Sequence, residues 1–229
     1  MEASIIRPET LQFLTDLTAH NDREWFASHK AAYETARANA SAFAAAFLKL
    51  MQAHDRLTPE RGGSGLYRIH NDLRFHKNKP IFNTRFAGGF HRLKPHLRGG
   101  YYWHIEPGRS YVSCGFFGPN ADDLKRIRQD IDHNWEEWEE IVGLPQIRET
   151  FGDMQGDQVK SAPSGYPKDH PGIKLLRYKQ FIFRHYFTDA EVLSPDFVKH
   201  ANACFRNIRP WFDYMSEVLT TDANGESIL

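Results

Sequence analysis

The amino-acid sequence predicts an α+β fold: a single domain over residues 1–229, with a mainly antiparallel central sheet flanked by N-terminal and C-terminal helices. Apolar residues recur at helical spacing near both ends of the chain, whereas the period changes to two between about residues 66 and 117. Short turns join the central segments, and parallel strands would need long crossover connections instead. No internal repeat and no long linker divides the chain.

The N-terminal part of the chain is predicted to be helical. A short helix begins at Pro8, because proline is favoured at the first helical position. Asn21 is the expected N-cap of the next helix, since Glu24 follows three residues later as in a capping box. An Ala-rich helical region then continues to about His54.

The central strands are predicted from alternating polar and apolar residues. They span residues 66–76, 85–91, 101–106 and 111–117, and a further strand is expected at 178–187. The turn Glu106-Pro107-Gly108-Arg109 favours an antiparallel hairpin between two of them. A second hairpin is expected near residues 147–160.

The remaining helices are predicted from their end signals. Asn120 is expected to cap one helix, and Asn134 to cap another that stops at Gly143. A short helix is expected around 171–176, and Thr188 with Glu191 forms a capping-box pattern. The closing helix should run to about residue 219, and residues 221–229 should form a frayed tail.

The composition indicates a cytoplasmic protein. The 29 basic residues balance the 29 acidic ones, and nucleic-acid or membrane-surface binders normally carry a basic surplus. Cys114 and Cys204 are too few for a disulfide framework and are expected to be buried thiols. The first residues lack the features of a signal peptide, and the densest apolar stretch, 42–48, is too short to span a bilayer.

Familiar catalytic signatures are absent from the sequence. It contains no Gly-rich dinucleotide or nucleotide motif after a strand, no H-E-x-x-H, no G-x-S-x-G and no C-x-x-C. Histidines at five positions could be assembled into a zinc site by loops: His70, His76, His91, His96 and His104. Histidines in such proteins are more often simply hydrogen-bonded, so we expect neither a metal nor a cofactor.

The stretch Y-R-I-H-N-D-L-R-F-H-K at 67–77 is the first candidate site. As a strand it would place Arg68, His70, Asp72, Arg74 and His76 on one face. The carboxylate of Asp72 should pair with one of the two arginines, because crowded charges need partners. Such a row is either a structural ion-pair network or a site whose guanidinium groups bind a carboxylate or phosphate.

Basic residues gather around this stretch. The segment 66–98 contains a single acid, whereas 119–157 is rich in acids, and the two regions either pair with each other or face water. For a small anionic ligand, the predicted binding residues are Arg68, Asp72, Arg74, Lys77, Lys79, Arg177 and Lys179. Arg177 and Lys179 follow the short helix at 171–176, so the alternative is that they cap its last carbonyl groups.

A second polar row lies on the strand predicted at 101–106, where Tyr102, His104 and Glu106 share a face. The strand at 178–187 offers either Arg184 and Tyr186 or the residues of the opposite register, Lys179 and His185. If these rows share one face of the sheet, they line a cleft suited to a small ligand.

Five segments carry a resemblance to a known family: N-D-R-E-W-F-A-S-H-K-A-A-Y-E at 21–34, R-I-H-N-D-L-R-F-H-K-N-K at 68–79, Y-Y-W-H-I-E-P-G at 101–108, G-Y-P-K-D-H-P-G-I-K-L-L-R-Y-K at 165–179 and L-S-P-D-F at 193–197. Together they resemble domain-of-unknown-function family 2461 along nearly the whole chain. The resemblance implies a shared fold and no particular activity. The sequence departs from the family pattern at Asn71, His76, Asn78 and Phe82.

Four functions are compatible with the sequence, and the favoured one is binding of a small anionic ligand. The second is an enzyme in which His70, His76 or His104 transfers a proton while Asp72 orients it. The third, less favoured, is a nucleic-acid binder acting through the basic segment 66–98 and its aromatic residues. The fourth is a structural or interaction role without a ligand. The sequence does not decide whether the protein is an enzyme, and it does not determine the oligomeric state.

Overall fold

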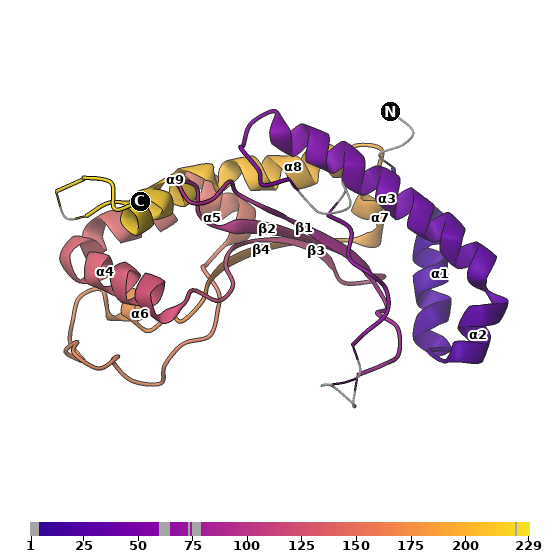
Figure 1. Ribbon diagram of the computed structural model, residues 1–229, viewed down its shortest axis with the longest axis horizontal. Helices are drawn as coiled ribbons and strands as arrows, with labels where there is room; N and C mark the ends of the chain where they lie inside the picture. The colour runs from indigo at the N-terminus through magenta and orange to yellow at the C-terminus, as the bar shows by residue number, and fades with distance from the viewer. Residues whose placement is uncertain (1–4, 60–64, 73, 75–78, 223) are drawn as a thin grey trace. The chain divides into compact units, whose positions relative to one another are not determined.

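A computed structural model describes residues 5–59, 65–72, 74, 79–222 and 224–229. Its strands are β1 (Phe86–His91), β2 (Gly100–Ile105), β3 (Ser110–Phe116) and β4 (Phe181–Phe187), and its helices are α1 (Pro8–Ala19), α2 (Arg23–Ser28), α3 (Lys30–Gln52), α4 (Ala121–Val142), α5 (Pro145–Phe151), α6 (Ile173–Leu176), α7 (Asp189–Val192), α8 (Phe197–Asn207) and α9 (Arg209–Thr220). The strands form one antiparallel sheet in the order β1-β2-β3-β4 (Figure 1). The α+β class and the antiparallel central sheet are therefore confirmed. Within the described residues, no helix has the length and apolar character needed to cross a membrane.

The chain forms two compact units whose residues interleave along the sequence. The first unit comprises residues 1–90, 102–112 and 186–203, and the second comprises 91–101, 113–185 and 204–229. Each strand has residues in both units, so no single cut in the chain separates them. The assignment of residues 1–229 to one domain stays a prediction.

Aromatic side chains of α3 build the core of the first unit. Phe43 packs against Trp103 of β2 and Phe197 of α8, with ring centroids 5.5 and 5.3 Å apart. Phe47 contacts Phe90 of β1 at 5.4 Å. The shorter helix α1 packs against α3 and contributes three fully buried or nearly buried leucines (Figure 1). Burial of these large rings is the main stabilising contribution here.

The N-cap of α2 differs from the prediction. Asp22 accepts the hydrogen bond from the Trp25 backbone N–H at 2.8 Å, so Asp22 and not Asn21 caps the helix. The side chain of Asn21 instead bonds to both the backbone N–H and the carbonyl of Phe82, each at 2.9 Å. A side-chain amide can donate and accept at the same time, so Asn21 satisfies both backbone groups of Phe82. As an N-cap it would use only its oxygen.

The strand predicted at 66–76 is wrong in the part that the structure describes. Its residues form isolated bridges, Leu66 with Gly88 and His70 with Phe82. Between these bridges one side advances by four residues and the other by six, so a continuous ladder cannot form. His76 and Lys77 lie outside the described residues.

Helix ends in the rest of the chain follow the sequence in part. Asn120 caps α4, and Thr188 with Glu191 forms a complete capping box on α7. Asn134 is not a cap, because α4 continues through it with a kink, and its side chain bonds to Asp130 one turn earlier at 3.0 Å. The closing helix is two helices, α8 and α9, with a proline in the first turn of α9.

The hairpin predicted near 147–160 is also wrong. Helix α5 occupies its first half, and Gln155 and Gln158 form bridges with Ile182 and Tyr178. In the tail at 221–229, which the sequence predicts to be frayed, Thr221 forms a bridge with Ser227.

The core of the second unit centres on Trp211 of α9. Its ring contacts Phe116 of β3 and Phe183 of β4, with centroids 5.6 and 5.0 Å apart. Helix α4 packs against α9, and its Trp138 contacts Phe181 at 6.0 Å. These contacts fix the ends of β3 and β4 that belong to this unit.

Candidate functional site

A pocket of about 400 Å³ lies within the first unit. We call it the Arg85 pocket, and its lining residues are Arg85, Tyr102, His104, Glu106, Arg109, Tyr111 and Tyr186. Four of these seven side chains are charged or can titrate near neutral pH (two arginines, a histidine and a glutamate), and the other three are tyrosines. Polar groups beside aromatic rings are the residue chemistry of a small-ligand site.

Side chains along β2 point alternately to the two faces of the sheet, and those on one face line the middle of the pocket. Tyr101, Trp103 and Ile105 point into the core and are almost completely buried. Tyr102 and His104 alternate with them, and Glu106 continues the row just beyond the strand end. The structure thus brings together the second polar row that the sequence analysis identified, and Tyr186 of β4 joins it.

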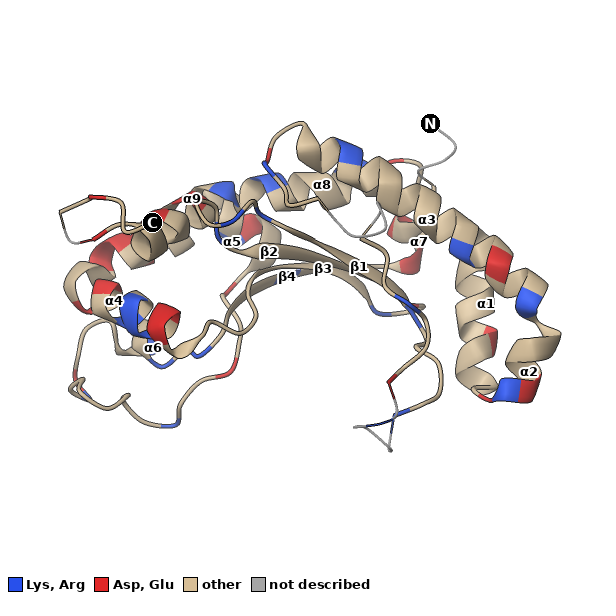
Figure 2. Ribbon diagram, in the orientation of Figure 1, with Lys and Arg blue, Asp and Glu red and all other residues tan. Residues whose placement is uncertain are grey.

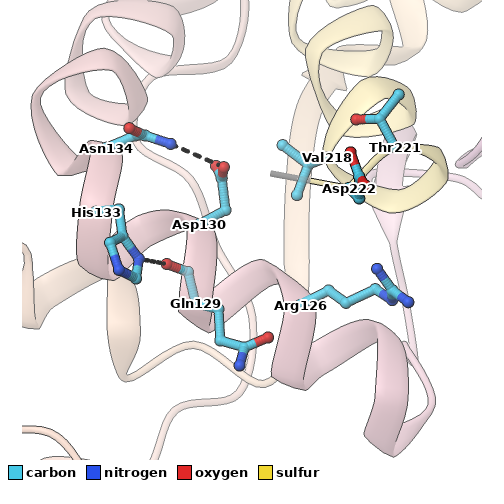
Figure 3. Close-up of a pocket in the computed structure, with 8 residues that line it drawn as sticks. All are labelled: Arg126, Gln129, Asp130, His133, Asn134, Val218, Thr221 and Asp222. Carbon is cyan, nitrogen blue, oxygen red and sulfur yellow. Dashed lines mark hydrogen bonds between the residues drawn. The ribbon is translucent and has the colours of Figure 1, made fainter. Parts of the chain in front are cut away.

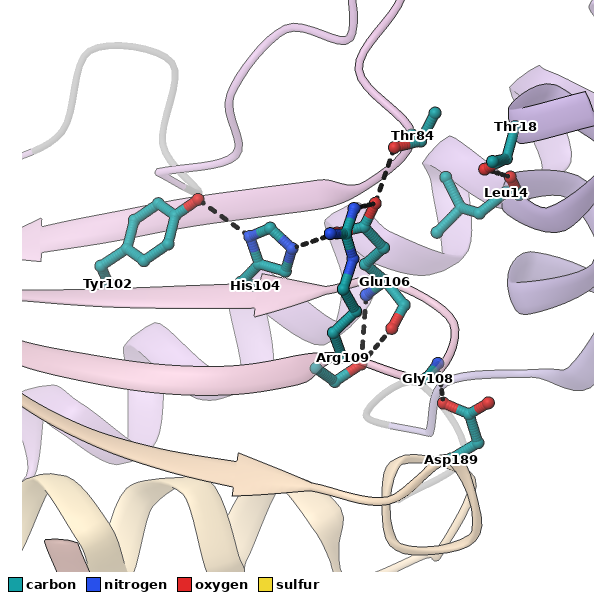
Figure 4. Close-up of polar contacts among 10 residues, drawn as sticks. Leu14, Thr18, Thr84, Tyr102, His104, Glu106, Gly108, Arg109 and Asp189 are labelled. Carbon is teal, nitrogen blue, oxygen red and sulfur yellow. Dashed lines mark hydrogen bonds and ion pairs between the residues drawn. The ribbon is translucent and has the colours of Figure 1, made fainter.

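A chain of hydrogen bonds links the three side chains of this row (Figure 4). His104 Nε2 lies 2.8 Å from a carboxylate oxygen of Glu106, and His104 Nδ1 lies 3.2 Å from the Tyr102 hydroxyl. An ionised Glu106 accepts a hydrogen bond from Nε2–H, which leaves the lone pair of Nδ1 to accept a hydrogen bond from the Tyr102 hydroxyl. The arrangement therefore selects one tautomer of the histidine.

Glu106 is the most heavily hydrogen-bonded group of the site. Its carboxylate also accepts hydrogen bonds from Arg109 Nη2 at 2.8 Å and from the Thr84 hydroxyl at 2.7 Å (Figure 4). Burial alone would raise the pKa of Glu106, but the hydrogen bonds from Arg109, Thr84 and His104 outweigh it, so this pKa lies below its ordinary value. Glu106 is ionised, and its charge is compensated within the site.

His104 is held neutral by its surroundings. Its side chain is buried, and burial is the main cause that lowers its pKa below the ordinary value. Glu106 acts in the opposite direction, while the positive charges of Arg85 and Arg109 lower the pKa further. Its ring also stacks on Tyr111, with centroids 4.5 Å apart and planes inclined by 17°.

Arg85 is the cation of the pocket whose charge is not matched by a neighbouring carboxylate. Among the described residues it has no hydrogen-bond or ion-pair partner, whereas Arg109 is paired with Glu106. The positive charge of Arg85 contributes to lowering the pKa of His104. A partly buried guanidinium in this position is suited to bind a carboxylate or phosphate group.

The first polar row lies elsewhere on the same unit. Asp72 pairs with both arginines, at 3.9 Å from Arg68 and 2.6 Å from Arg74, so the predicted pairing is confirmed. The side chains of Arg68 and Arg74 are 73% and 78% exposed, and such ion pairs contribute little to stability. None of these residues lines the Arg85 pocket, and their role in binding a ligand stays a prediction.

Two further candidates from this part of the chain, among the residues that the structure describes, lie on the surface. His70 is exposed and lies edge-on to Phe82, with ring centroids 5.0 Å apart, and Lys79 is exposed as well. His76 and Lys77 are outside the described residues. Of the catalytic candidates that the structure describes, His104 is the one that lines the Arg85 pocket.

Arg177 and Lys179 belong to the second unit. The Arg177 guanidinium donates to the carbonyl of Val159 at 2.9 Å, so it fastens a neighbouring loop and does not cap the carbonyl groups of α6. The backbone N–H of Lys179 bonds to the Asp157 carbonyl at 2.7 Å, and its side chain is exposed. The sequence-predicted ligand set is thus divided between the two units.

The sequence analysis did not assign Arg85, Arg109 or Thr84 to a site. Arg109 could have been found, because it follows Glu106 by three residues across a tight turn, with Gly108 at a φ of 73°. Arg85 and Thr84 carry no such local signal. The folded chain brings Arg85 into the pocket and the Thr84 hydroxyl to Glu106, because it pairs β1, which follows them, with β2.

A second pocket of about 510 Å³ lies in the second unit (Figure 3). Its lining residues are Arg126, Gln129, Asp130, His133, Asn134, Val218, Thr221 and Asp222. Its central carboxylate, Asp130, already accepts hydrogen bonds from Trp138 at 2.6 Å, Tyr214 at 2.9 Å and Asn134 at 3.0 Å. Burial, followed by the charge of Asp130, raises the pKa of Tyr214, which keeps this phenol protonated. We therefore regard Asp130 as a structural centre that ties α4 to α9.

The charged regions seen in the sequence are only partly paired. The acid-rich segment 119–157 lies largely on α4 and α5 (Figure 2), and the ion pair Arg98–Asp123 joins it to the basic segment 66–98. In the part of the chain that the structure describes, no group of three or more His, Cys, Asp or Glu side chains is placed to hold a metal ion.

Comparison with known proteins places the chain in a family. The model of a family described as "Conserved hypothetical protein (DUF2461)" matches residues 9–214, nearly the whole chain. No curated protein and no solved structure matches the chain. The resemblance carried by the five sequence segments is thereby confirmed, and the chain belongs to the DUF2461 family of conserved hypothetical proteins.

Proposed function

We propose that this protein binds a small anionic ligand, with a phosphate or carboxylate group, in the Arg85 pocket. The observation that carries the proposal is the charge distribution in the pocket. Glu106 is already compensated by Arg109, Thr84 and His104, so the positive charge of Arg85 remains to attract an anion. Two or three charge-assisted hydrogen bonds of about 1.5–3 kcal/mol each would support an affinity on the order of millimolar to micromolar.

The test compares two arginines of the same unit. Arg85→Gln is expected to weaken binding of inorganic phosphate and of succinate by about tenfold or more, because it removes one charge-assisted contact. Arg68→Gln, on the exposed ion pair with Asp72, should leave both affinities unchanged. Isothermal titration calorimetry at low ionic strength measures both variants. If Arg68→Gln abolishes binding and Arg85→Gln does not, the ligand binds at the row around Asp72 instead.

A second candidate function is acid–base catalysis in the same pocket. The chain from Tyr102 through His104 to Glu106 supports it, because a carboxylate that orients a neutral histidine is a recurrent arrangement for proton transfer. In this reading Tyr102 or His104 exchanges a proton with the bound ligand, and Arg85 stabilises negative charge that develops on it.

This candidate predicts the protonation state of His104. At pH 7 its ring should be neutral with the proton on Nε2, and it should titrate below about 6.5, the ordinary histidine value. Because the folded-state pKa is lowered, the unfolded chain binds the proton more readily. The domain should then lose stability as the pH falls from about 6.5 toward the folded pKa.

Long-range ¹H–¹⁵N spectra of the histidine rings measure the tautomer and the pKa of His104. Urea unfolding at pH 8 and pH 5.5 should show a smaller pH dependence in His104→Gln than in the parent. Tyr102→Phe is the matched control, because it removes the phenol oxygen from Nδ1 and keeps Glu106 on Nε2. A His104 ring that titrates above 6.5 would contradict the proposed proton transfer through Tyr102, His104 and Glu106.

The proposal includes a reducing, cytoplasmic location and no role for membrane or nucleic-acid partners. Both cysteines are buried free thiols, which supports the reducing location. Burial raises the pKa of Cys114 well above its ordinary value and that of Cys204 to about 12, so both thiols stay protonated. Labelling of fractionated cells with an antibody to the protein tests the location.

A further inference from the structure

Four tyrosines of the first unit form a continuous row, which we call the tyrosine ladder: Tyr67, Tyr102, Tyr111 and Tyr186. Successive ring centroids are 6.2, 5.8 and 5.6 Å apart. The rings come from four different segments: the loop before β1, then β2, β3 and β4. Three of them line the Arg85 pocket, and the ladder continues beyond it to Tyr67.

The two ends of the ladder are exposed to solvent. Tyr67 and Tyr186 are 50% and 56% exposed, and they belong to a small group of strongly exposed large hydrophobic side chains among the described residues. Tyr102 and Tyr111, between them, are half-buried. An aromatic surface of this kind, built across several strands and left open, is characteristic of a binding site.

The spacing of the rings limits how a ligand can contact them. Neighbouring planes are inclined by 34°, 44° and 56°, and no centroid distance exceeds 6.2 Å. A flat base inserted between two rings needs contact distances of about 3.5–4.0 Å on each side, hence roughly 7 Å or more between parallel rings. The ligand must therefore lie over the ladder and contact the rings one after another.

The polar groups beside the ladder limit the charge of the ligand. Among the residues that line the pocket, Arg85 is the cation that is not matched by a described carboxylate, because Arg109 is paired with Glu106. A phosphodiester chain carries one negative charge per unit, so only one of its charges would find a cationic partner in this pocket. Tyr102, His104 and Arg109 supply donors and acceptors that suit hydroxyl groups.

We propose that the ligand is an acidic sugar chain: its anionic group, a carboxylate or a phosphate ester, binds Arg85, and its rings lie along the tyrosine ladder toward Tyr67. A sugar ring presents C–H groups on its faces and hydroxyl groups at its edge, so it matches phenol faces flanked by hydrogen-bonding side chains. This inference rests on the proposed function, because it uses the same anion position at Arg85.

The experiment has two stages. First, the labelled protein is applied to an array of neutral, carboxylate-bearing and phosphate-bearing glycans, and the acidic ones should be retained selectively. Which acidic class is retained then distinguishes the two sources of the anionic group. Second, the best acidic glycan is titrated by calorimetry as fragments of one to four sugars. Affinity should increase with length, by about tenfold or more from one sugar to four, as further rings are contacted.

Three variants test the ladder itself. Tyr67→Ala and Tyr186→Ala should each weaken binding of the four-sugar fragment by about three- to tenfold, in proportion to the loss of one aromatic contact. Both positions are exposed, so the fold should tolerate the substitutions, which a thermal unfolding curve checks. Phe117→Ala is the control: this ring is 40% exposed but is not part of the ladder, and the affinity should not change.

The outcomes separate this inference from the proposed function. If no acidic glycan is retained, or if the ladder variants bind like the parent, while Arg85→Gln still weakens phosphate binding, the ligand class is wrong and the anion site stands. If phosphate, succinate and glycans all fail to bind, both are wrong. Tighter binding of an eight-nucleotide oligothymidylate than of any acidic glycan would overturn the sugar assignment in favour of a single-stranded nucleic acid.

Discussion

Asp213→Ala is expected to lower the free energy of unfolding by about 3 kcal/mol, because it leaves a buried cation without its carboxylate. Arg92 is completely buried, and its Nη2 lies 2.5 Å from an oxygen of Asp213. Neutral groups also contact it: Ser216 Oγ at 3.2 Å, the carbonyl of Arg98 at 3.4 Å and the ring of Phe212. We choose the lower end of the range for broken buried pairs because the Asp213 side chain is 54% exposed, so water replaces part of the loss.

Two further variants isolate the effect of the buried charge. Arg92→Met removes the cation together with its desolvation cost and should destabilise the protein less than Asp213→Ala. Arg209→Gln removes the other arginine near Asp213, at 3.4 Å, and should cost less than about 1 kcal/mol because this contact is weaker and reaches solvent. Urea denaturation gives all three values. Equal midpoints for Asp213→Ala and Arg209→Gln would mean that Arg92 does not depend on the carboxylate.

Gly115→Ala is expected to destabilise the protein by about 3 kcal/mol or more, since backbone strain and overpacking of about 1–3 kcal/mol each add together. Gly115 lies in β3 with a φ of 141°, and a Cβ atom there would stand 2.1 Å from the carbonyl oxygen of Phe181 in β4. A backbone oxygen in a sheet cannot move aside without breaking strand pairing. The glycine is therefore required for the close approach of the two strands.

Gly118→Ala is the matched control for Gly115→Ala. A Cβ atom at Gly118 would meet nothing within 4 Å, and the same substitution three residues along should change the free energy of unfolding by no more than about 0.5 kcal/mol. Thermal and urea unfolding of the two variants measure the difference. If Gly115→Ala unfolds at the same denaturant concentration as Gly118→Ala, β3 and β4 are not held as closely as described.

Several elements of the fold could be predicted because their signals are local. The caps at Asn120 and at Thr188 with Glu191 depend on side chains that reach backbone groups within three residues. The strands β2 and β3 were predicted to within one residue at each end, since alternation and a tight turn act over short distances. Asn21 was misassigned because a distant backbone group, that of Phe82, competes for its amide.

The candidate site was predictable only along single strands. Tyr102, His104 and Glu106 share a face because period two is a property of the strand itself. At residues 68–70 burial does alternate, with Ile69 buried and Arg68 and His70 exposed, yet the described residues of 66–76 form isolated bridges and no strand. Pairing with the segment before β1 slips by two residues, and register depends on the partner segment as much as on the stretch itself.

By itself, the sequence determined the α+β class, the antiparallel order of short-linked strands, several helix caps, the polar row at 102–106 and the family. Only the tertiary structure decided which charges remain uncompensated. It pairs Glu106 with Arg109 and Thr84, aligns four tyrosines from four segments, and brings Arg85 into the pocket without a carboxylate partner among the described residues. The physical reason is range: backbone periodicity and capping act over a few residues, whereas charge compensation and ring packing depend on groups that only strand pairing brings together.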